Sequence, residues 1–140
     1  MAERSEVERL AGVELFKGLT RKELRVIAGL AKALSFPEGA VVAEEGTPGG
    51  RFFLILDGEA KVTVGSRTRR TLRAGDYFGE ISLIDGQPRS ATIVAATPLR
   101  TLALAEWNFR SALLTNPGIA RKLLVELCRR LRSAESSVTA

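Results

Sequence analysis

Residues 51–64 read RFFLILDGEAKVTV, two apolar runs separated by the turn residues Asp57 and Gly58. The first run has the texture of a strand, and the second alternates apolar and polar side chains from Ala60 to Val64. Alternation with a period of two turns one face of a strand toward the core. The stretch therefore predicts two short β-strands joined by a turn.

The same texture extends from residue 36 to residue 104, in the runs FPEGAVVAEEG, TRRTLRAGDYFGE and SATIVAATPLRTLAL. Turn residues separate these runs, at 37–39, 47–50, 65–66, 74–76 and 97–98. Evenly spaced short strands with such turns are typical of closed or folded antiparallel sheets. We expect a jelly-roll-like antiparallel β-barrel of about eight strands over residues 36–104.

Helical patterns precede and follow this region. Residues 5–34 show helical spacing of apolar side chains with an interruption around Gly18, and Thr20 with Glu23 forms a capping-box pattern for the second helix. Helices are also expected at 106–134, with Asn116 as the cap and Pro117 as the first residue of the last one. Its apolar side carries Ile119, Leu123, Leu124, Leu127 and Leu131. The 140 residues are thus expected to form one domain, mainly β with flanking helices.

Composition narrows the classes of function. Hydrophobic residues make up 45% and charged residues 26%, as in folded proteins, while the net charge of +5 suits anionic partners in general. Histidine is absent, which argues against Ser-His-Asp hydrolases and histidine-ligated metal or haem sites. We therefore expect no catalytic residues, no metal and no cofactor. The single cysteine, Cys128, lies in an apolar periodic stretch and is expected to face the core or a groove.

No apolar run approaches the roughly 20 residues that cross a bilayer, and the N-terminus MAERSEVERL lacks the apolar segment of a signal peptide. The sequence therefore predicts a cytoplasmic protein without membrane insertion.

Residues 78–92 read FGEISLIDGQPRSAT and place charged residues beside an apolar ISLI run. Gly79 permits close approach of the backbone to a ligand, and the residues after it can form one helical turn whose amides face an anion. The turn at 85–88 can fold the chain back so that Arg89 meets the same anion, with Ser90 adding a hydroxyl and an amide. Glu80 would repel that anion unless it accepts a hydrogen bond from a ligand hydroxyl. The pattern predicts a site for a small phosphorylated sugar or nucleotide.

The stretch resembles the phosphate-binding cassette of cyclic-nucleotide-binding domains, the family found in kinase regulatory subunits, nucleotide-gated channels and catabolite activators. The matching positions are Phe78, Gly79, Glu80, Leu83, Gly86, Pro88, Arg89 and Ala91. The order of elements over residues 13–132 is similar too. The resemblance implies a regulatory sensor for a cyclic nucleotide, with a C-terminal helix that moves when ligand binds.

The same resemblance implies a role for each site residue. Glu80 would accept from the ribose 2′-hydroxyl, and Arg89 would pair with the cyclic phosphate. Further ligand contacts would come from Phe78, Gly79, Ile81, Ser82, Ser90 and Ala91. The base would lie near Val62, Val64 and Ala91, beneath a lid that includes Leu123, Leu124 and Leu127.

One position departs from the family pattern. Gly50 stands where an acidic residue tethers the cassette arginine in the family, so the resemblance does not imply which group holds Arg89. Arg89-Ser90-Ala91 is similar to the cassettes of cyclic AMP binders, so cyclic AMP is favoured over cyclic GMP. The sequence does not identify the downstream partner.

Three alternatives stay open. The pocket could be vestigial in a protein–protein interaction domain, or the chain could be the sensor part of a transcription regulator or a channel. DNA binding by the chain itself is not expected, since only about eight residues follow the predicted lid helix and a helix-turn-helix domain does not fit there. A homodimer through the leucines of the last helix is a further alternative.

Overall fold

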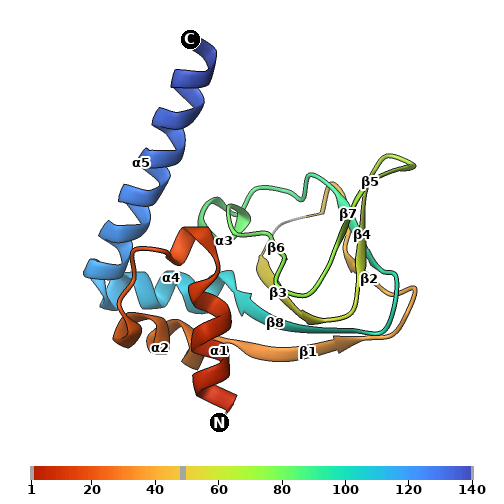
Figure 1. Ribbon diagram of the computed structural model, residues 1–140, viewed down its shortest axis with the longest axis horizontal. Coiled ribbons are helices and arrows are strands. Elements are labelled where there is room, and N and C mark those ends of the chain that lie inside the picture. Colours follow the sequence, from red (N-terminus) through yellow and green to blue (C-terminus); the bar gives the residue numbers. More distant parts are fainter. Residues whose placement is uncertain (1, 48–49, 140) are drawn as a thin grey trace. The chain divides into compact units, whose positions relative to one another are not determined.

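The computed structural model describes residues 2–47 and 50–139 (Figure 1). Its elements, in chain order, are α1 (Ala2–Ala11), η1 (Glu14–Phe16), α2 (Arg21–Leu30), β1 (Lys32–Phe36), β2 (Val41–Ala43), β3 (Arg51–Asp57), β4 (Ala60–Val64), β5 (Arg67–Leu72), β6 (Tyr77–Phe78), α3 (Ser82–Asp85), β7 (Thr92–Ala95), β8 (Leu99–Ala105), α4 (Glu106–Thr115) and α5 (Pro117–Thr139). They form two compact units. The sheet unit spans residues 30–110, and the helical unit combines residues 1–29 and 111–140.

The sheet unit contains two antiparallel four-stranded sheets. Their strand orders are β1-β8-β3-β6 and β2-β7-β4-β5, and the long pairing of β1, β8 and β3 is visible in Figure 1. The prediction of about eight antiparallel strands with flanking helices is confirmed. The predicted closure into a barrel is wrong, because among the described residues no hydrogen-bonded ladder joins one sheet to the other.

The turn at Asp57 and Gly58 carries the chain from one sheet to the other, since β3 and β4 pair with different partners. Gly58 has a φ of +97°, and a Cβ there would overlap the carbonyl oxygen of Pro98. The amide of Glu59 donates to Thr97 Oγ1 at 3.0 Å, which fixes the exit of the turn. Along β4, Ala60 and Val62 are buried and Lys61 is exposed, as predicted, whereas Thr63 and Val64 are both half-buried.

The core of the sheet unit lies between the two sheets. Its buried members are Ala43, Ile55, Ala60, Val62, Leu72, Ile93, Ala95 and Leu99. Aromatic rings extend this core toward residue 78: Phe53 stacks on Phe78 with centroids 5.1 Å apart, and Phe36 meets Phe53 edge-on at 6.0 Å. The start of the 78–92 stretch is therefore anchored to the core.

The helical unit is held together by a capped helix. Thr20 N donates to Glu23 Oε1 at 2.8 Å and Glu23 N donates to Thr20 Oγ1 at 3.1 Å, which confirms the predicted capping box of α2. Lys122 Nζ of α5 also donates to Glu23 Oε1, at 2.6 Å. Pro117 is the first residue of α5 as predicted. The side-chain Nδ2 of Asn116 donates to the Ala112 carbonyl of α4 at 2.9 Å, so this side-chain group bonds to the preceding helix and not to α5.

Several boundaries and exposures differ from the sequence prediction. The second helix ends at Leu30 rather than 34, because Lys32–Phe36 pairs along its whole length with β8. The last helix extends to Thr139, beyond the predicted residue 134. Cys128, expected to face the core or a groove, is exposed, because it lies on the outward side of α5.

Residues 48 and 49 of the predicted turn at 47–50 lie outside the described residues. Within the described ranges, none of the helices combines the length and the apolar character needed to span a membrane. The prediction of one domain over the whole chain stays a prediction.

Glu23→Gln tests how the helical unit is held. Lys122, followed by the Thr20 amide, lowers the pKa of Glu23, so the carboxylate stabilises the fold above its ordinary pKa and this stability is lost as pH falls through the lowered value. We expect the variant to lose about 1 kcal/mol of unfolding free energy at pH 7 and to match the parent in strong acid. Urea unfolding across pH measures this. Glu38→Gln is the control, because Glu38 is exposed. If Glu23→Gln still lowered the unfolding free energy in strong acid, the carboxylate charge would not be the source of the stability.

Candidate functional site

Gly79 brings three parts of the sheet unit to one point. It follows β6 with a φ of +85°, a conformation that side chains with a Cβ rarely adopt. A Cβ there would lie 2.5 Å from the carbonyl oxygen of Arg51 and would overlap the guanidinium of Arg89. The absence of a side chain is therefore what lets Arg89 reach the backbone of β3.

The next residues form the single turn α3. Leu83 is fully buried and its amide donates to the Gly79 carbonyl at 3.0 Å, which ties the turn to the glycine. Gly86 ends the turn in a left-handed conformation, with its amide donating to the Ser82 carbonyl at 2.8 Å. The Ile84 and Asp85 amides donate to the Ile81 carbonyl, so among the described residues only the Ser82 amide of α3 has no backbone acceptor. This amide at the start of the turn is suited to an anion.

Arg89 is held at both its backbone and its side chain. Its amide donates to the Thr47 carbonyl at 2.8 Å, and its carbonyl accepts from the Gly46 amide at 2.9 Å. Its Nη2 donates to the carbonyl oxygen of Arg51. A backbone oxygen thus holds the guanidinium in this chain, in which Gly50 stands at the acidic position of the family pattern.

Burial lowers the pKa of the half-buried Arg89 guanidinium, although an arginine stays charged at neutral pH. In the described part of the chain, no ion pair to a carboxylate neutralises it. A partly buried charge of this kind is stabilised by a charged partner of opposite sign. The arrangement therefore favours an anionic ligand.

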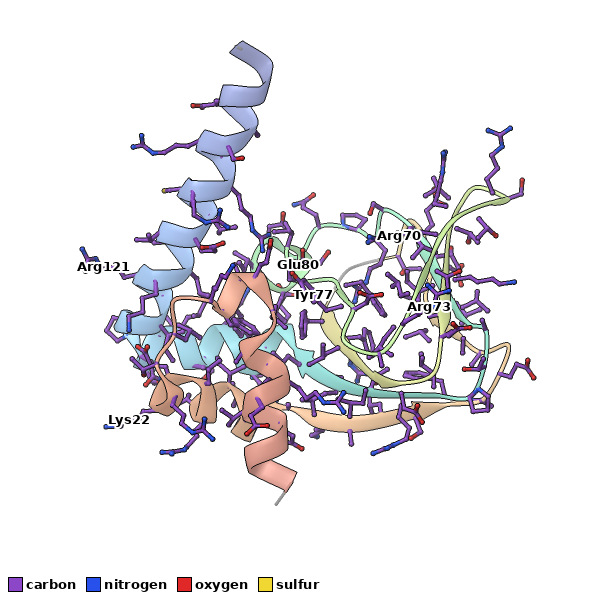
Figure 2. The ribbon with its side chains drawn as sticks, viewed as in Figure 1. Lys22, Arg70, Arg73, Tyr77, Glu80 and Arg121 are labelled. Carbon is purple, nitrogen blue, oxygen red and sulfur yellow. The ribbon has the colours of Figure 1, made fainter. Side chains whose placement is uncertain are left out.

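A cavity of about 530 Å³ opens beside Arg89. The predicted site residues that line it are Val62, Phe78, Gly79, Glu80, Ile81, Ser82, Arg89, Ser90 and Ala91. Glu80 and Arg89 therefore share one cavity, so the structure brings together the acid and the base that the sequence proposed for a sugar hydroxyl and a phosphate. Figure 2 labels Glu80 with Tyr77 and Arg70, two further lining residues.

Three predicted residues are placed differently. Val64 is half-buried at the end of β4 and is not among the lining residues of this cavity. Leu124 and Leu127 belong to α5 in the helical unit, where Leu124 is 62% exposed and Leu127 is half-buried. Leu123 is buried in the same unit. The lid role of these leucines stays a prediction.

Sequence reasoning missed five lining residues, namely Arg70, Leu72, Asp76, Tyr77 and Ile93. Strand pairing could have indicated two of them, since Val62 lies opposite both Arg70 on β5 and Ile93 on β7. Residues directly opposite in an antiparallel pair share a face. The register that pairs β4 with β5 and β7 joins separate segments and is not contained in the local sequence pattern.

Comparison with known proteins identifies the family of this chain. Residues 33–116 match the model of the cyclic nucleotide-binding domain family. A cyclic nucleotide-gated potassium channel of Mesorhizobium japonicum is 38% identical over 111 residues, 79% of this chain and 31% of the channel. A CRP-like cAMP-activated global transcriptional regulator of Mycobacterium tuberculosis is 31% identical over 138 residues, 94% of this chain and 61% of the regulator.

Among solved structures, the N-terminal domain of a transcriptional regulator from Streptomyces coelicolor superposes with a TM-score of 0.84 at 27% identity. The match covers 93% of this chain and 95% of that domain. The chain spans less than two thirds of the length of both sequence relatives, between 31% and 61%. The similarity thus concerns one module of larger proteins.

Gly79→Ala tests the contact between glycine and guanidinium. We expect a loss of about 3 kcal/mol of unfolding free energy, because the left-handed backbone becomes strained and the Arg51 carbonyl must move. Gly75 is the matched control, since its φ of +93° is similar but a Cβ there meets open space. Gly75→Ala should lose only about 1 kcal/mol. Equal losses in urea unfolding would show that Gly79 is not required for close approach.

Proposed function

The chain belongs to the cyclic nucleotide-binding domain family, and from this we propose that it binds a cyclic nucleotide in the 530 Å³ cavity and acts as a regulatory sensor. Arg89 and the Ser82 amide at the start of α3 bind the cyclic phosphate. Glu80 accepts a hydrogen bond from the ribose 2′-hydroxyl. The apolar part of the cavity, with Val62 and Ala91, receives the base.

One observation carries this proposal. Arg89 is half-buried, is held by a backbone oxygen rather than by an acid, and lines the same cavity as Glu80. A structural ion pair would place a carboxylate on the guanidinium, which no ion pair of the described residues does. The positive charge is therefore available to a phosphate, as a charge-assisted hydrogen-bond donor.

The base is adenine in this proposal. Arg89-Ser90-Ala91 is similar to the cassettes of cyclic AMP binders, and the mycobacterial relative is a cAMP-activated regulator. The two relatives named above are a nucleotide-gated channel and a transcriptional regulator. The proposed role is accordingly to sense the nucleotide and not to transform it.

The signal leaves the cassette through α4. A Cβ at Gly86 would lie 2.9 Å from Glu106 Oε1, so the end of α3 is in close contact with the first residue of α4. Glu106 also forms an ion pair with Arg110 at 2.7 Å, one turn along α4. When ligand orders the cassette, a shift of α3 changes this contact and biases the helices that follow. The receiver of the signal is a protein or domain whose identity the chain does not specify, and a second copy is one alternative.

Thermal unfolding with cyclic AMP, cyclic GMP and linear AMP at equal concentration tests the proposal. A ligand that binds only the folded state raises the midpoint. We expect both cyclic nucleotides to raise it, cyclic AMP more strongly, and linear AMP to leave it unchanged. If no nucleotide raised the midpoint, the pocket would be vestigial and the interaction-domain alternative would replace this proposal.

Arg89→Gln and Glu80→Gln separate the two polar contacts. Each is expected to weaken cyclic AMP binding by about 10- to 100-fold, because each removes a charge-assisted hydrogen bond to the ligand. The controls are Arg100→Gln and Glu38→Gln, which make the same charge changes at exposed positions away from the cavity. Isothermal titration calorimetry measures the affinities. Equal effects in site and control variants would mean that net charge alone attracts the nucleotide.

A further inference from the structure

A cluster of exposed cations lies in the helical unit, where α2 and α5 begin. Its members, called the basic patch below, are Lys17, Arg21, Lys22, Arg25 and Arg121. Figure 2 shows Lys22 and Arg121 extending away from this unit on the same side of the view. Within the described ranges, no member of the basic patch takes part in an ion pair. Their positive charges therefore face solvent.

Contacts between α2 and α5 bring these cations together. Lys122 Nζ donates to Glu23 Oε1 at 2.6 Å, and a Cβ at Gly118 in the first turn of α5 would lie 3.6 Å from Glu23 Oε2. A Cβ at Gly18 would lie 3.9 Å from the Cβ of Lys122. Lys17 and the first turn of α2 thus lie beside the first turns of α5.

The acid that follows Lys22 in the sequence does not neutralise the basic patch. The carboxylate of Glu23 accepts from Lys122 Nζ at 2.6 Å and from the Thr20 amide at 2.8 Å. Glu23 and Lys122 therefore balance each other, and the charges of the basic patch come in addition to this pair.

The position of two of these cations opposes the stability of their own helix. The N-terminal end of a helix carries a partial positive charge, so basic residues destabilise its first turn and stabilise its last turn. Arg21 and Lys22 lie in the first turn of α2, whereas its last turn contains no basic residue. A local arrangement that costs fold stability is typical of a functional surface. An anionic partner would reverse this cost, because both the side chains and the helix end attract it.

The surroundings of the basic patch favour a protein partner over a nucleic acid or a membrane. Single-stranded nucleic acids are bound by stacking bases on aromatic side chains. In the described part of the helical unit the one aromatic residue is Phe16, which is buried. A helix that binds a membrane surface inserts its apolar face between lipids. The apolar face of α2, with Leu24, Ile27 and Ala28, is buried within the protein.

The spacing of the arginines suits carboxylates on a helix. Arg21 and Arg25 are four residues apart on α2, a spacing that places Cβ atoms roughly 5–6 Å apart on one face. Glutamates four residues apart on a partner helix have the same spacing, and each carboxylate can accept two hydrogen bonds from a guanidinium. We propose that the basic patch binds an acidic segment of a partner protein. This inference goes beyond the proposed function and does not depend on nucleotide binding.

Charge reversal on matched surfaces tests the proposal. A patch variant combines the substitutions Arg21→Glu, Lys22→Glu and Arg121→Glu. A control variant makes the same charge change at three exposed arginines of the sheet unit that do not line the nucleotide cavity, through Arg67→Glu, Arg69→Glu and Arg100→Glu. Acidic residues are favourable at the start of a helix, so the patch variant is expected to fold, which urea unfolding checks. The probe is a fluorescein-labelled helical peptide with glutamates four residues apart, and fluorescence anisotropy gives its affinity.

The parent chain is expected to bind this peptide and not its glutamine counterpart. The patch variant should bind it about tenfold or more weakly, and the control variant should stay within about twofold of the parent. Equal losses in the two variants would overturn the proposal, because net charge alone would then attract the peptide. No binding by the parent would also overturn it. Tighter binding of a single-stranded oligonucleotide or of phosphatidylserine vesicles, lost in the patch variant, would replace the acidic protein segment by a nucleic acid or a membrane.

Discussion

The site depends on one contact, in which the Arg89 guanidinium donates to the carbonyl of Arg51 across the empty side of Gly79. This contact joins the 78–92 stretch to β3, while the amide and carbonyl of Arg89 join it to residues 46 and 47. The groups that Arg89 contacts in this way are backbone carbonyls and a backbone amide, and none of them carries a negative charge. The positive charge therefore remains without a counter-ion in the described structure, which is the physical condition for binding an anion.

The departure from the family pattern at Gly50 has a structural consequence. An acidic residue at that position would neutralise part of the guanidinium charge, and the backbone carbonyl of Arg51 does not. A carbonyl orients the guanidinium with a hydrogen bond while leaving its charge for the phosphate. Glu80 lines the same cavity. The affinity for a nucleotide therefore has two polar contributions, the attraction of Arg89 for the phosphate and the hydrogen bond that Glu80 accepts from the ribose.

Local patterns were predictable from the sequence, and pairing between distant segments was not. The capping box of Thr20 and Glu23, the alternation of β4 and the cassette residues are each contained in a few consecutive positions. The end of α2 at Leu30 depends instead on pairing of β1 with β8, some 70 residues away. Arg70 was missed for the same reason, because its place at the cavity follows from the register with Val62. The two separate sheets also reflect long-range pairing.

The binding of the phosphate by Arg89 is tested most directly by NMR observation of its guanidinium. In a sample labelled with ¹⁵N at arginine, the Arg89 side-chain resonance can be assigned by its loss in Arg89→Gln and followed during titration with cyclic AMP. The account predicts a large, saturable shift of this resonance at a 1:1 ratio, with no comparable shift at Arg100. A titration that left the Arg89 resonance unmoved while cyclic AMP bound would contradict the claim that this residue holds the phosphate.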